Sequence, residues 1–110
     1  MRWFSANVVK PKDKNMGMNL QPRNDPADES VDYNWTGWGT LQTYLQKWGV
    51  DTSEFKGVND GDIISAETCG KVAVALAAHL DELPTDHKAW LKDHAEMWEY
   101  LHDMGGCEQH

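Results

Sequence analysis

The sequence predicts a mainly α-helical fold, a small three-helix domain whose last two helices form an antiparallel hairpin. Three observations support this class: apolar residues recur at helical spacing in three segments, glycine or proline follows each segment, and 110 residues suit a single core. Six tryptophans add apolar area to a core that aliphatic residues alone would leave thin. We therefore expect one helical domain over residues 31–110, preceded by an irregular N-terminal arm over residues 1–30.

The three helices are expected at residues 37–48, 66–83 and 86–104. After the first, Gly49 can adopt the left-handed conformation that often ends a helix. Before the second, Ser65 can cap the first turn, and Pro84 follows its end. The third has Thr85 as a candidate cap and carries a wide apolar stripe. Because the link between the second and third helices is very short, we expect them to pack as a hairpin.

The two remaining segments are expected to lack helix. Residues 10–30 contain three of the four prolines and much Asn, Asp and Lys, with no helical or alternating pattern. They offer little apolar surface, so we expect the domain to fold without the arm. Between the first two helices, Asn59-Asp60-Gly61 is typical of a tight turn between short extended pieces.

The charge distribution bears on the class of partner. The formal net charge is −8, and residues 31–110 hold five basic and fourteen acidic side chains. Such a surface repels phosphate backbones, so direct binding of DNA or RNA is disfavoured, whereas basic protein surfaces are attracted. No apolar run approaches the ~20 residues of a membrane span, and the N-terminus lacks the pattern of a secretory signal. With only Cys69 and Cys107, which we expect to be reduced, the prediction is a cytoplasmic protein.

Catalytic and metal-binding patterns are weak. The sequence contains no nucleophile elbow, phosphate-binding glycine loop or His-Glu-x-x-His motif. His87 and His94 are seven residues apart, about 10 Å along a helix, which is too far for both to hold one zinc ion unaided. As a calcium loop, the segment around Gly61 has Lys56 at the first ligand position. We therefore expect no catalytic residues, metal site or cofactor, although an enzyme using Cys69 or the histidines stays an alternative.

Three stretches together resemble a family of small uncharacterised bacterial and phage-associated proteins. They are Asn34-Trp35 with Trp38, Asn59-Asp60-Gly61 with Ile64-Ser65-Ala66-Glu67 before an alanine-rich helix, and an aromatic helix ending in Leu101 and Gly105-Gly106. The resemblance covers residues 33–106, and Cys107 stands where that family has an aromatic or apolar residue. It implies a shared fold and carries no activity.

The binding surface is expected where the start of the first helix meets the Asn59-Asp60-Gly61 turn. Aromatic side chains there offer rigid contact area, and neighbouring polar groups offer directional contacts. The candidate binding residues are Tyr33, Asn34, Trp35, Asn59, Asp60 and Asp62.

These observations favour a non-enzymatic acidic protein that binds a protein partner. A basic or nucleic-acid-binding partner fits the charge, and the protein would then act as a decoy or inhibitor. The alternative is a small-molecule or nucleotide-binding protein that stacks a flat ligand in a tryptophan-lined pocket.

Overall fold

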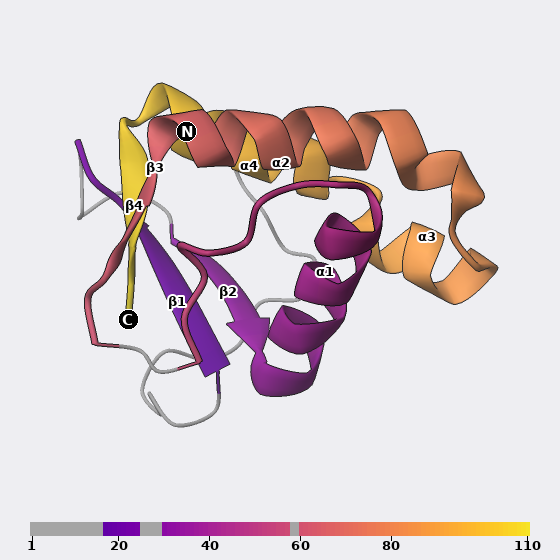
Figure 1. Ribbon diagram of the computed structural model, residues 1–110, viewed down its shortest axis with the longest axis horizontal. Helices are drawn as coiled ribbons and strands as arrows, with labels where there is room; N and C mark the ends of the chain where they lie inside the picture. The colour runs from indigo at the N-terminus through magenta and orange to yellow at the C-terminus, as the bar shows by residue number, and fades with distance from the viewer. Residues whose placement is uncertain (1–16, 25–29, 58–59) are drawn as a thin grey trace.

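The computed structural model describes residues 17–24, 30–57 and 60–110. Within these ranges, four strands and four α-helices are arranged around one core, and helices α2 and α4 lie side by side (Figure 1). The elements in chain order are β1 (Gly17–Pro22), β2 (Val31–Asn34), α1 (Trp35–Lys47), β3 (Ile63–Ser65), α2 (Ala66–His79), the short 3-10 helix η2 (Leu80–Glu82), α3 (Thr85–Leu91), α4 (His94–Asp103) and β4 (Gly106–Gln109).

The prediction of a mainly α fold is wrong, because the strands form a four-stranded antiparallel sheet in the order β2-β1-β4-β3. The strands are three to six residues long, too short to show a distinct period in the sequence. Their partners are also remote: Leu20 pairs with Gln109, near the other end of the chain. The fold is therefore a mixture of helix and sheet.

The prediction of an irregular arm over residues 1–30 is also wrong where it can be compared, because residues 17–22 form β1, an inner strand between β2 and β4. Met18, Leu20 and Pro22 are buried, while Asn19 and Gln21 are only partly covered, which is the alternation of a strand. This alternation is short and lies among Pro, Asn and Asp residues, which are typical of loops, so the sequence did not indicate a strand. Residues 1–16 lie outside the described part of the chain.

The helices begin and end for local reasons. Asn34 caps α1 by accepting a hydrogen bond from the Gly37 amide, and Ser65 caps α2 in the same way for Thr68. Gly49 follows α1 at a φ of 81°, as expected of a left-handed cap. The expected third helix is two helices, α3 and α4, separated by a turn at residues 92–93, and Thr85 lies inside α3 and does not cap it. No helix within the described ranges is long and apolar enough to cross a bilayer.

An aromatic stack fills the core between the helices and the sheet. The ring of Phe55 lies between those of Trp38 and Trp98, with centroid distances of 4.9 and 5.7 Å and nearly parallel planes. The indole N–H of Trp38 donates to the Lys56 carbonyl over 2.8 Å. The stack thus attaches the loop after α1 to both α1 and α4.

We expect the chain to lose its fold when residues 1–24 are removed. The deletion takes away β1, so β2 and β4 lose their shared neighbour and the buried Met18 and Leu20 are lost with it. Circular dichroism and thermal unfolding of a chain starting at Asp25 should show no cooperative transition. A cooperative transition near that of the full chain would show that β1 is dispensable.

We expect Gly106→Ala to destabilise the protein by about 3 kcal/mol. Gly106 has a φ of 97°, and a Cβ built there would lie 2.5 Å from the Ile64 carbonyl oxygen of β3. Gly39→Ala is the matched control, because Gly39 lies inside α1 with nothing within 4 Å of its Cβ position. That change should stabilise by about 0.5–1 kcal/mol. Urea unfolding measures both, and equal effects of the two substitutions would contradict the role of Gly106.

Candidate functional site

Three of the predicted site residues, Tyr33, Asn34 and Trp35, lie where β2 joins α1, and each has a structural role there. Tyr33 is fully buried in β2. Asn34 is exposed, but its side chain is engaged as the cap of α1. Trp35 is partly buried and packs against the core cluster.

The other predicted site residues that the structure describes lie near the opposite edge of the sheet, before β3. Asp60 and Asp62 are exposed just before β3, and Asn59 lies outside the described residues. β1 and β4 separate β2 from β3, so Asn34 and Asp62 are three strand spacings, or roughly 14 Å, apart across the sheet, and the register displaces them further along the strands. The described candidate residues therefore do not converge on one small-ligand site.

Tyr33 instead belongs to a buried polar cluster with Trp98 and His94. The Trp98 indole N–H donates to the Tyr33 hydroxyl oxygen over 2.9 Å, and the hydroxyl lies 2.6 Å from Nδ1 of His94. The Tyr33 hydroxyl therefore joins the Trp98 indole and the His94 imidazole in one hydrogen-bonded cluster. Burial holds the pKa of His94 down at about 4 and raises the pKa of Tyr33. Nε2 of His94 is buried and has no hydrogen-bond partner among the described residues.

The two cysteines form a second buried group. Both are free and fully buried, Cys69 in α2 and Cys107 in β4. Contact with Cys69 and burial raise the pKa of Cys107 well above its usual value, which disfavours the nucleophilic thiolate.

Two of the histidines, His79 and His87, have hydrogen-bond partners of their own. His79 Nδ1 lies 2.8 Å from a carboxylate oxygen of Glu82, and His87 is hydrogen-bonded to the Tyr44 hydroxyl. Within the described ranges, no three His, Cys, Asp or Glu side chains are grouped to hold a metal ion.

A shallow, open groove of about 1290 Å³ extends over α2 and α4. The two helices run antiparallel beside it (Figure 1). We call the small and apolar α2 residues that line it the α2 floor: Gly70, Ala73, Val74, Ala75, Ala77 and Ala78. Val74 is 70% exposed and is the most exposed large apolar side chain among the described residues.

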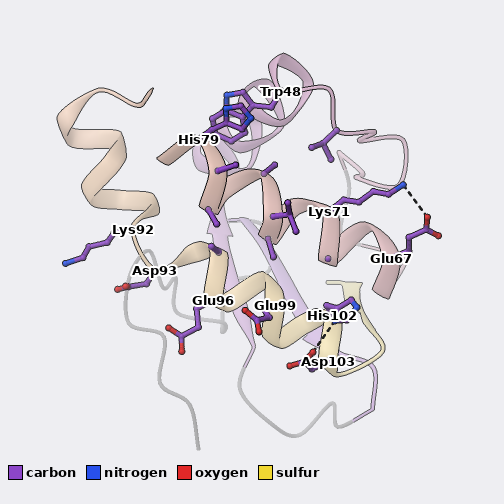
Figure 2. Close-up of a pocket in the computed structure, with 18 residues that line it drawn as sticks. Trp48, Glu67, Lys71, His79, Lys92, Asp93, Glu96, Glu99, His102 and Asp103 are labelled. Atoms are coloured by element: carbon purple, nitrogen blue, oxygen red, sulfur yellow. Dashed lines mark hydrogen bonds and ion pairs between the residues drawn. The ribbon is translucent and has the colours of Figure 1, made fainter. Parts of the chain in front are cut away.

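The groove is acidic along α4. Five carboxylates and two lysines line it, and three of the carboxylates, Glu96, Glu99 and Asp103, project from α4 at spacings of three and four (Figure 2). We call these three the acidic row. On α2, the Lys71 ammonium is paired with the Glu67 carboxylate, with a nitrogen–oxygen distance of 3.3 Å. The groove therefore combines an apolar base with an excess of negative charge on one side.

A stacked aromatic pair stands at the C-terminal end of α2. The Trp48 ring lies on the His79 ring with a centroid distance of 4.7 Å and an angle of 8° (Figure 2). Tyr44 stacks on the same indole ring at 5.5 Å. These contacts hold Trp48 in a fixed orientation at the edge of the groove, so the ring offers rigid apolar area.

The groove was not predicted from the sequence, because its apolar residues and its carboxylates lie on two helices that only the tertiary structure brings together. The available signal was Val74, an apolar residue among the alanines at positions 73, 75, 77 and 78.

We expect His94 to make the protein less stable in acid. Its folded pKa of about 4 lies below the unfolded value of 6.5, so the unfolded state binds the proton more readily between these values. The free energy of unfolding should therefore fall by about 3 kcal/mol from this group as the pH drops from 7 to 4. Urea unfolding across this range should show that loss in the wild type and in His102→Gln, whose histidine is exposed. It should be absent in His94→Gln, and an unchanged pH slope in that variant would contradict the assignment.

Comparisons with protein-family models, with curated proteins and with solved structures found no match for this chain.

Proposed function

We propose that this protein is a non-enzymatic interaction protein that binds a basic surface of a partner protein in the groove over α2 and α4. The observation that carries the proposal is the pairing of an apolar floor with an acidic row in one groove. Apolar contacts supply affinity when water leaves the floor, and the carboxylates select and steer a partner of opposite charge.

The charge of the whole molecule supports this choice. The net charge of −8 attracts basic proteins over distances set by the ionic strength and repels nucleic acids. A partner that itself binds nucleic acid has a basic surface of the required kind. By occupying that surface, the protein would act as a decoy or an inhibitor. The free cysteines agree with a cytoplasmic location, where thiols stay reduced.

The alternatives have less support among the described residues. Trp38 and Trp98 are buried in the core, so neither presents a face on which a nucleotide could stack. Cys69 is fully buried, which leaves no approach for a substrate to its sulfur.

A pair of charge-reversed variants tests the proposal. Glu99→Lys/Asp103→Lys changes the acidic row, and it should leave α4 folded because lysines near a helix C-terminus interact favourably with the helix dipole. Asp60→Lys/Asp62→Lys changes the net charge equally at exposed positions outside the groove. The tagged wild type should capture its partner from the source cells, and added salt should weaken the complex.

We expect the groove variant to lose about tenfold in affinity for that partner at low salt, and the control variant to lose much less. Calorimetry with the purified partner measures both, after circular dichroism has shown that each variant is folded. The opposite order would place the interface at the turn before β3, where the sequence predicted it. Equal small losses would refute an electrostatic role for either surface.

A further inference from the structure

We infer that the segment bound in the groove is an amphipathic α-helix of the partner, with aliphatic residues facing the α2 floor and lysine or arginine facing the acidic row. This inference rests on the proposed function and specifies the partner of the same groove. It follows from three features of the groove: its backbone, its dimensions and the position of its charges.

The backbone of the floor has no hydrogen bonds to offer a bound strand. Residues 70–78 lie inside α2, so their N–H groups are engaged within that helix. A strand laid on the floor would lose water from its own N–H and C=O groups and would find no partners there. A helix satisfies its backbone internally, so it can cover the floor without that cost.

The dimensions of the groove suit the close approach of a helix. Residues 70–78 extend for about 12 Å along α2, and residues 96–103 for about 10 Å along α4. A helix placed on the floor would meet small side chains on either side of Val74, so its axis could approach α2 to about 8 Å. Val74 would then insert between side chains one turn apart on the bound helix.

The acidic row determines which side of the bound helix is basic. Glu96, Glu99 and Asp103 follow one line on α4 (Figure 2), so a helix lying beside α4 would match them with cations spaced by three or four residues. A second copy of this chain is a poor occupant, because it would bring its own net charge of −8 against the same carboxylates.

Synthetic peptides of 18 residues made of leucine, alanine and lysine test the inference with a defined probe. In the first, leucine and alanine form one helical face and lysine the other; in the second, the same residues are scrambled so that no amphipathic helix is possible. The third has glutamate in place of lysine. Calorimetry measures affinity for the wild type, and circular dichroism measures any gain of helix on binding.

We expect the amphipathic lysine peptide to bind and to gain helix, and the scrambled peptide to bind at least about tenfold more weakly. The glutamate peptide should not bind. Val74→Gln, which keeps an exposed residue in α2 but removes its apolar contact, should weaken binding of the first peptide about fivefold. Glu99→Lys/Asp103→Lys should weaken it further, and Asp60→Lys/Asp62→Lys should leave it nearly unchanged.

The outcomes separate the inference from the proposed function. The scrambled and amphipathic peptides could bind equally and both lose affinity in Glu99→Lys/Asp103→Lys. That result would refute a helical ligand and would still support a basic partner in the groove. If neither lysine peptide binds, both proposals fail. If the protein alone forms a dimer in sedimentation that Val74→Gln disrupts, the occupant is a second copy, and the inference is overturned.

Discussion

The backbone pairing of β4 with both β1 and β3 is the constraint on which the other parts of the structure depend. These four residues near the end of the chain join the N-terminal half of the sheet to β3. The buried side chain of Gln109 extends the connection, because it accepts from the Lys56 amide and donates to the carbonyls of Glu54 and Asp62. The loop between α1 and β3 is therefore held by a residue more than forty positions away.

The same pairing produces the groove. β3 continues directly into α2, and α4 reaches β4 through a short turn, so pairing β3 with β4 brings the start of α2 beside the end of α4 (Figure 1). Gly70 lets the helices come close there: a Cβ at that position would lie 3.0 Å from the His102 ring. The outer faces of the two helices then form one surface, which joins the alanines of one to the carboxylates of the other. Neither helix alone would provide both.

The core and the groove use the aromatic residues differently. Tyr33, Trp38 and Trp98 serve the core, where the hydroxyl of Tyr33 satisfies the indole N–H of Trp98 and a nitrogen of His94. Trp48 stays at the margin, where stacking on His79 fixes its ring while part of it faces solvent. In this protein the described tryptophans therefore mainly enlarge the core and do not form a ligand pocket. The groove instead depends on small side chains and their charged neighbours.

Local sequence determined where helices lie and two of their ends, because capping and helical spacing act within a few residues: Ser65 caps α2 and Gly49 follows α1, as predicted. It did not show that Asn34 caps α1 or that a turn at residues 92–93 divides the last helix. It did not determine the sheet, since strands as short as β3 gain their stability from partners that are remote in sequence. Nor could it show that Tyr33 would be buried while Asp62 stayed exposed beside the opposite edge strand, or that Val74 would face the same groove as Glu99. Composition and charge indicated an acidic surface, but only tertiary packing decided where an apolar base lies beside it, because that depends on which helix faces the remaining elements leave uncovered.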